Sequence, residues 1–542
     1  MLQQTSEKES FKMNRKKKFD TGAADDKLQE LFNFQNKYKI PEDAPPGIII
    51  STDEPDKKKD YVIFILSDLH MGVHTKNRII KTRQKNQSVD VMSDWNVDKS
   101  DSNLFDKYQA SKFVKWLEFI ENELNELSEK HQNKSKDYHL IINGDFLDLW
   151  QARAPMIIPN LKVSNMDDDD LTREIPHSYK SRIDEIFDMY VYGYTIYLDY
   201  NEDGQKMIEG KGYWNVVDSN PNYKVLQALL RFACGKNRKV IYLIGNHDDP
   251  LYTGNNDKDP AYGNKPCPNA EILRQYLIQK LDGIRKNEGL PEIARSNIQI
   301  GRFYWNREVG VYAEHGHIFD KENWKQTDSD GCLSQHFNEG ILAELKETTE
   351  IPSLRYVDNV PHDEIIKYLR CLVRYKITKW RSYNKLPDHE KRLQNIAKKV
   401  LLNGSRIERG LWGRVITEFW DLTTPADKFI KMGIEELSKV SKIKSEKCMD
   451  RAALLAKITG AQVLTFGHTH NHYFCRSENW VYVNTGEWIT DVKFVKFQRR
   501  LRASHQKKHC KLRRNNEGED HYLKIYTSSD GNMLFVQLDY CK

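Results

Sequence analysis

Five apolar stretches of this chain each end in residues that bind metal ions or transfer protons. The first stretch, YVIFIL at residues 61–66, is followed closely by Asp68 and His70. An apolar run of this length without polar alternation is typical of a strand buried on both faces. Asp and His at its end supply an oxygen and an imidazole nitrogen two positions apart. The stretch therefore predicts a strand whose tip carries a metal ligand pair.

The same arrangement recurs at four further places. The apolar runs HLIIN, VIYLIG, VGVYAE and AQVLTF lead into the polar groups GDFLD, GNHDD, HGH and GHTH. The candidate residues of those groups are Asp145, Asp148, Asn246, His247, Asp248, His315, His317, His468 and His470. Core packing gives no reason for a ligand type at every strand end. The recurrence predicts that distant strand ends meet at one site.

Taken in order, DLH, GDFLD, GNHD, a later His and GHTH resemble the five motifs of the calcineurin-like metallophosphoesterases. This resemblance implies an α/β fold, a four-layer α/β/β/α sandwich, with a pair of metal ions at the strand tips. It implies that Asp145 bridges the two ions. The ligands implied for the first ion are Asp68, His70, Asp145 and His470, and those for the second ion are Asp145, Asn246, His315 and His468.

The chemistry expected of such a site is the hydrolysis of a phosphomonoester, a phosphodiester or a pyrophosphate. Oxygen and imidazole ligands without thiolates favour Mn²⁺, Fe²⁺, Zn²⁺ or Mg²⁺, and Mn²⁺ is our first expectation. Two ions would lower the pKa of a shared water and hold a phosphoryl oxygen in line with it. His247 is the candidate acid for the leaving oxygen, with Asp248 orienting its imidazole. We expect Asp148 and His317 to support the ligands rather than coordinate.

Two other functions stay open. A metal-dependent nuclease is one, because residues 493–514 hold ten Lys or Arg and no acid and could follow a nucleic-acid backbone. A non-enzymatic, metal-stabilised scaffold is the other, although a scaffold has no need of the acid His247. For a single motif, helix capping by Asp145 or Asp148 would be sufficient explanation. It does not explain the full set, because a buried cluster of these groups without metal is costly.

Within the family, SDLHMG, HGH, the insertion after it, and GHTH followed by YVNTGEWI look most like one bacterial branch. That branch includes the UDP-2,3-diacylglucosamine pyrophosphatases. Those enzymes carry Arg where this chain has His247, so the resemblance is not extended to their lipid substrate.

The motifs also divide the chain. Residues 1–60 are predicted to be a polar N-terminal extension with a short helix over 25–38. The metallophosphoesterase core is predicted over 61–319, with an insertion at 151–220, and over 450–542. Helical apolar spacing between them predicts a large helical insertion at 320–449 that could cover the site as a lid. Within the core we expect a hairpin of residues 298–305 with 309–314, and a solvated basic loop at 493–514.

Composition restricts the environment of the chain. Its 84 basic and 78 acidic residues leave a formal net charge of only +6, so any phosphate-binding surface must be local. The eight cysteines form no C-x-x-C pair and are expected to be reduced thiols. The first twenty residues contain lysines and acids but no apolar core, so no secretory signal is expected there. No apolar run is long enough to span a membrane. We therefore expect a cytoplasmic protein that acts on a phosphoester substrate, and we leave a homo-oligomer open.

Overall fold

The computed structural model describes the core of the chain and parts of its insertions. The described residues are 9–14, 22–38, 40, 44–51, 60–71, 80–84, 87–89, 107–130, 136–149, 183, 186–187, 195–200, 206–212, 221–248, 251, 270–320, 323–324, 445–488, 492–502, 505–514, 520–527 and 533–541. For strands β1, β4, β5, β7, β8, β16 and β17 only the backbone is described. Nearly all of the predicted helical insertion at 320–449 lies outside these ranges.

One sheet contains seven strands in the order β1-β19-β18-β3-β6-β9-β10. Their bounds are Glu9–Asn14 (β1), Met533–Cys541 (β19), Asp520–Thr527 (β18), Asp60–Leu66 (β3), Lys136–Asn143 (β6), Arg238–Leu243 (β9) and Ile298–Gly301 (β10). Strands β3, β6, β9 and β10 run parallel, and β18 joins β3 in antiparallel fashion. The carboxyl ends of β3, β6 and β9 therefore lie at the same edge of the sheet.

A second sheet contains six strands in the order β14-β15-β13-β12-β11-β2. Their bounds are His472–Arg476 (β14), Val481–Thr485 (β15), Val463–Phe466 (β13), Val311–Glu314 (β12), Phe303–Asn306 (β11) and Ile48–Ile50 (β2). Strands β12 and β13 run parallel, so their carboxyl ends also share an edge.

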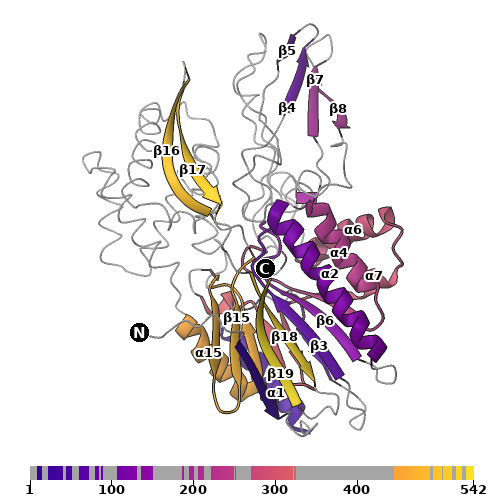
Figure 1. Ribbon diagram of the computed structural model, residues 1–542, viewed down its shortest axis with the longest axis vertical. Coiled ribbons are helices and arrows are strands. Elements are labelled where there is room, and N and C mark those ends of the chain that lie inside the picture. The colour runs from indigo at the N-terminus through magenta and orange to yellow at the C-terminus, as the bar shows by residue number, and fades with distance from the viewer. Residues whose placement is uncertain are drawn as a thin grey trace, which may run out of the picture.

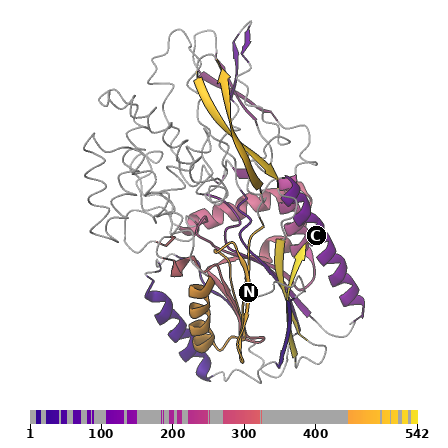
Figure 2. The same cartoon turned by 60° about the vertical axis from the view of Figure 1, so that its left-hand side comes forward.

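The helices cover the outer faces of these two sheets. Helices α2 (Lys107–Lys130), α4 (Pro221–Cys234), α6 (Ala270–Asn287) and α7 (Ile293–Ser296) lie on the seven-stranded sheet, while α1 (Gly22–Asn36) and α15 (Ser445–Thr459) lie together on the other side of the molecule (Figures 1 and 2). None of the described helices has the length and apolar content required to cross a membrane.

Three apolar cores follow from this packing. Buried side chains of the two sheets meet between them, as with Ile63 and Ile141 from one sheet and Val311 and Val463 from the other. The alternate residues of the same strands face the helices, and Phe64, for example, packs with Trp116 of α2. Strand β3 is buried throughout because both of its faces are covered. An α/β sandwich is therefore confirmed.

Helices connect parallel strands of the seven-stranded sheet. Helix α2 connects the parallel pair β3–β6, and α4 connects the parallel pair β6–β9. Helix α15 ends at Thr459, directly before β13, and β18 pairs with β19 as an antiparallel hairpin.

Residues 1–60 are more than a polar extension. Strand β1 adds to the edge of the seven-stranded sheet, and β2 pairs with β11 in the other sheet. Helix α1 buries Leu31 and Phe34 against the outer face of that second sheet. The segment thus contributes to both sheets and to a helical layer.

The predicted hairpin at 298–314 is wrong in its first half. Strand β10 pairs with β9 in the seven-stranded sheet, whereas β11 pairs with β12 in the six-stranded sheet. The chain passes from one sheet to the other between Gly301 and Phe303. Strand β10 (IQIG) and strand β11 (FYWN) are separated by a single residue, so the sequence pattern does not reveal the crossing.

Further strands lie outside the two main sheets. The expected basic loop at 493–514 is an antiparallel hairpin of β16 (Val492–Arg502) and β17 (His505–Arg514), which Figure 1 shows at the upper left, apart from the strands of the two main sheets. Strands β4 (Ile80–Gln84) and β5 (Gln87–Val89) join β7 (Thr195–Tyr200) and β8 (Lys206–Gly212) in a four-stranded sheet.

Candidate metal centre

The candidate site lies where the carboxyl ends of β3, β6, β9, β12 and β13 meet. Backbone hydrogen bonds connect the loops that follow these strands: the amide of Asp68 donates to the carbonyl of Gly144 at 3.1 Å, and the amide of Gly467 donates to the carbonyl of His315 at 3.1 Å. In α/β folds, ligands bind beyond the carboxyl ends of parallel strands. The predicted meeting of distant strand ends is observed here.

One group of side chains contains Asp68, His70, Asp145 and His470. The Nε2 atoms of His70 and His470 are 3.3 Å apart. Nε2 of His470 lies 3.4 Å from Oδ1 of Asp68, and Nε2 of His70 lies 3.7 Å from Oδ2 of Asp145. Each residue offers one ligand atom, and these atoms all lie within 4.8 Å of one another. This group can hold a metal ion.

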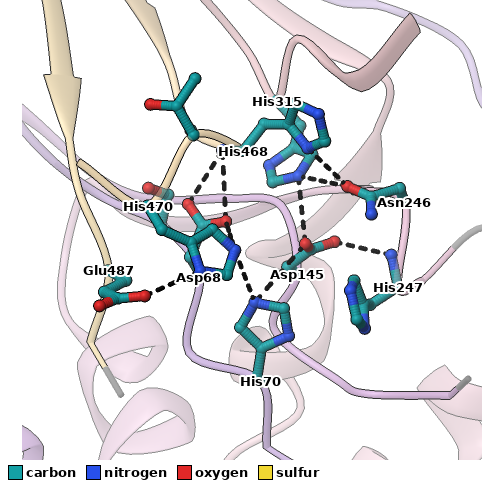
Figure 3. Close-up of polar contacts among 12 residues, drawn as sticks. Asp68, His70, Asp145, Asn246, His247, His315, His468, His470 and Glu487 are labelled. Carbon is teal, nitrogen blue, oxygen red and sulfur yellow. Dashed lines mark hydrogen bonds and ion pairs between the residues drawn. The ribbon is translucent and has the colours of Figure 1, made fainter. Parts of the chain in front are cut away.

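A second group lies on the other side of Asp145 and contains Asn246, His315 and His468 (Figure 3). Oδ1 of Asn246 lies 3.0 Å from Nε2 of His315 and 2.9 Å from Nδ1 of His468. Nε2 of His315 also lies 3.2 Å from Oδ2 of Asp145. All seven predicted ligands are therefore brought together in two groups that share one carboxylate.

Asp145 faces the two groups through a single oxygen. Its Oδ1 accepts a hydrogen bond from the backbone amide of His247 at 2.8 Å. Its Oδ2 is buried, and the imidazoles of His70 and His315 approach it. An acceptor in this position is suited to a cation on each side.

The protonation of His315 also indicates that the site suits a cation beside Asp145. Its Nδ1 lies 2.8 Å from the carbonyl oxygen of Asn143, which can only accept, so Nδ1 carries a proton. Nε2 of a neutral His315 then directs a lone pair at Oδ1 of Asn246 and Oδ2 of Asp145. Three acceptors this close repel one another unless a proton or a metal ion lies among them. The donor set therefore fits a divalent cation.

The charges of the site shift the pKa values of its members. Burial would raise the pKa of Asp145, but His315, His247 and His70 hold it well below its usual range. Burial would lower the pKa of His315, but Asp145 and Asp68 raise it to about 9. Burial and the carboxylate of Asp145 raise the pKa of Asp68. In the absence of metal, a proton on His315 thus takes the place of a cation beside Asp145.

The backbone at the site is held in an uncommon conformation. Among the described residues, six that are not glycine have a positive φ, and Asn237 is the only one outside the site. The other five are candidate ligands: Asp68, His70, Asp145, His468 and His470, with φ between 50° and 72°. Asp, Asn and His tolerate this region better than other residues, and such strain is concentrated at functional sites.

Two glycines of the motifs leave room for the ligands. A Cβ atom at Gly144, where φ is +88°, would collide with the imidazole of His315. A Cβ atom at Gly245 would collide with the carboxylate and the backbone amide of Asp145. Each glycine thus permits a ligand from a neighbouring strand to approach the backbone closely.

The partner predicted for His247 is wrong. Nδ1 of His247 lies 2.9 Å from Oδ1 of Asp148, and this contact, not one with Asp248, orients the imidazole. Burial would lower the pKa of His247, but Asp148 and Asp145 raise it above its usual value. Asp148 also lies 3.7 Å from Nδ1 of His70.

Asp248 instead stabilises the loops. Its carboxylate accepts hydrogen bonds from the backbone amides of Phe146, Leu147 and Gly245 at 3.3, 3.0 and 3.2 Å. Asp148 and Asp248 come from separate motifs, and nothing in the sequence decides which of them contacts His247.

Two acids of the site were missed by sequence reasoning. Oδ2 of Asp320 lies 3.0 Å from Nε2 of His468, and Oε2 of Glu487 lies 2.8 Å from Nδ1 of His470. Glu487 belongs to the TGEW segment that carries part of the resemblance, but nothing in the sequence around it indicated a role for its side chain. Asp320 stands at the predicted boundary of the insertion, where no pattern indicated a function.

The chain matches no family model, no curated protein and no solved structure. The class of the protein must therefore be argued from its motifs and from the site.

Proposed function

We propose that this chain is a calcineurin-like phosphoesterase that uses two divalent metal ions to hydrolyse a phosphomonoester, phosphodiester or pyrophosphate. The observation that carries the proposal is the convergence of candidate ligands from five strand ends on either side of Oδ2 of Asp145. The packing of helices, two sheets and helices also supports the four-layer sandwich that the motif resemblance implies.

In this proposal each group of ligands holds one ion. Asp68, His70 and His470 hold one with Asp145, and Asn246, His315 and His468 hold the other with Asp145. Mn²⁺ is the first candidate, because oxygen and imidazole donors without thiolates suit it. Bound ions supply a water of lowered pKa and neutralise charge on the phosphoryl oxygens.

His247 is proposed to give a proton to the leaving oxygen. Its backbone amide is bound to Asp145 and its Nδ1 to Asp148, so the imidazole is held beside the ligands from two directions. The edge of the His70 ring is packed against it, with ring centroids 4.5 Å apart. An acid held in a fixed position contributes to the departure of a basic oxygen.

The experiment is a metal-dependent ester assay. The chain, stripped of metal by a chelator, should be inactive, and Mn²⁺ should restore cleavage of p-nitrophenyl phosphate or bis-p-nitrophenyl phosphate. Asn246→Ala should lower the activity by more than about 100-fold, since even an outer partner of a ligand contributes about 10–100-fold. Asn471→Ala, at an exposed asparagine in the loop of the last motif, is the matched control.

The same assay separates the two other functions. Degradation of single-stranded DNA that is abolished by charge reversal in 493–514, with cleavage of the small ester unchanged, would favour the nuclease. Stoichiometric metal binding without cleavage of ester or nucleic acid would favour the scaffold and contradict the proposal.

A further inference from the structure

Two acidic residues outside the five motifs contact the last pair of histidines. Asp320 follows the short helix η6 (His317–Phe319), and Glu487 follows strand β15. Both carboxylates are largely shielded from solvent, with 3% and 11% of the side chain exposed. Each contacts the ring nitrogen that points away from the candidate metal ligands.

The contact of Asp320 sets the orientation of His468. Nδ1 of His468 faces Oδ1 of Asn246 at 2.9 Å, while its Nε2 lies 3.0 Å from Oδ2 of Asp320. A carboxylate accepts, so it favours the tautomer with the proton on Nε2. That tautomer leaves the lone pair of Nδ1 directed into the group that contains Asn246, as ligation requires.

Asp320 also acts on Asn246 through Asn323. The amide of Asn323 donates to Oδ2 of Asp320 at 2.6 Å, which leaves its Oδ1 to accept from Nδ2 of Asn246 at 3.4 Å. This chain of contacts decides which way the Asn246 amide points. It directs Oδ1, the atom that can bind a cation, toward His315 and His468. One carboxylate therefore orients two ligands of the same group.

Glu487 contacts a histidine of the other ligand group, the one that contains Asp68 and His70. Its Oε2 lies 2.8 Å from Nδ1 of His470, whose Nε2 faces Asp68 at 3.4 Å and Nε2 of His70 at 3.3 Å (Figure 3). The carboxylate charge of Glu487 beside Nδ1 favours the ring orientation in which Nε2 of His470 faces the group. The two acids thus contact different histidines, which belong to different groups.

We propose that Asp320 and Glu487 are positioning residues that act on one metal ion each. Asp320 sets the affinity of the ion held by Asn246, His315 and His468, and Glu487 sets that of the ion held by Asp68, His70 and His470. The inference rests on the proposed two-metal site. It also connects the first residues of the insertion at 320–449 to the occupancy of one particular ion.

The test is a Mn²⁺ titration of the metal-free full chain, followed by the electron paramagnetic resonance signal of the free ion. The variants are Asp320→Asn, Glu487→Gln and the exposed control Asp450→Asn, each alone and combined with Asn246→Ala. Circular dichroism checks that each variant is folded. Removing such an outer partner typically weakens metal binding by about 10–100-fold.

The expected pattern is selective. Asp320→Asn and Glu487→Gln should each weaken the binding of one of the two ions by about 10–100-fold and leave the affinity for the other ion unchanged. Asn246→Ala removes a ligand of only one group, so one ion should remain tightly bound. In the Asn246→Ala background, Glu487→Gln should weaken the binding of the remaining ion, and Asp320→Asn should have no further effect on its affinity.

Two results would overturn the inference. One is an Asp320→Asn protein that binds both ions as tightly as the Asp450→Asn control. The other is an equal effect of the two substitutions on the ion that remains in Asn246→Ala. Because binding is the readout, a chain that binds Mn²⁺ without cleaving esters refutes the proposed function and leaves this test intact. An active chain with unaltered Asp320→Asn binding refutes only the inference.

Discussion

At the scale of single residues, the site separates groups that hold the metal from groups that act beside it. In the proposed ligand sets His247 belongs to the second kind, and its backbone amide donates a hydrogen bond to Asp145. Its imidazole is paired with Asp148 at 2.9 Å. A substitution of the ring can therefore remove a proton donor without removing a ligand.

His247→Gln should lower kcat by about 10²–10⁴-fold for a phosphoester with a poor leaving group, because the leaving oxygen then needs a proton. The loss should be much smaller for p-nitrophenyl phosphate, whose leaving group departs as a stable anion. Mn²⁺ affinity should stay unchanged, and kinetics on both esters together with a metal titration measure all three quantities. Equal losses on the two esters would exclude the role of an acid.

Metal binding should release protons at neutral pH. The pKa of His315 in the metal-free protein is raised to about 9 by Asp145 and Asp68, against the effect of burial. The group is protonated below that pH and must lose a proton to ligate through Nε2. The apparent affinity should therefore rise with pH up to about 9, by about tenfold per pH unit for each proton released.

Calorimetric Mn²⁺ titrations at pH 7.5 in two buffers of different ionisation enthalpy give the number of protons. At least one proton should be released per chain. An enthalpy that is independent of the buffer would show that His315 is neutral before metal binds.

At the scale of elements, the strand ends place the ligands and the glycines beside them make room. Gly144→Ala should lower the melting temperature and abolish binding of one ion, because a Cβ atom there meets the ring of His315. Gly289→Ala is the matched control, since its φ is also positive, +62°, and no atom lies within 4 Å of a Cβ there. The control carries only the backbone cost of about 1–2 kcal/mol.

Melting curves and Mn²⁺ titrations of both variants isolate the collision from the backbone strain. If Gly144→Ala binds metal and melts as Gly289→Ala does, the packing of His315 against this loop is not as the structure has it.

The secondary-structure elements also show how much of the fold could be predicted from the sequence. The strands that lead to the motifs and the helices α2, α4, α6 and α15 could be predicted because each has a strong apolar period and a clear stop. The crossing between β10 and β11 could not, since a single residue separates the two strands and only their pairing partners differ. Strand β2 contains three residues, too few for a pattern.

At the scale of the whole molecule, the sequence motifs predicted the grouping of ligands but not their supports. Asp68 and His470 are separated by most of the chain, yet both belong to motifs and both were assigned to one group. Asp320 and Glu487 belong to none of the five motifs, because an acid that contacts a histidine from outside needs no particular spacing. Such residues become visible only when the two sheets are packed together.

The central claim is that the two sheets bring two metal ions to one carboxylate. An anomalous difference map from crystals of the chain grown with Mn²⁺ tests it most directly. The account predicts two peaks on either side of Oδ2 of Asp145, separated by about 3.5–4 Å as in other two-metal hydrolases. A map without a peak among these residues, or with its peaks remote from Asp145, would contradict it.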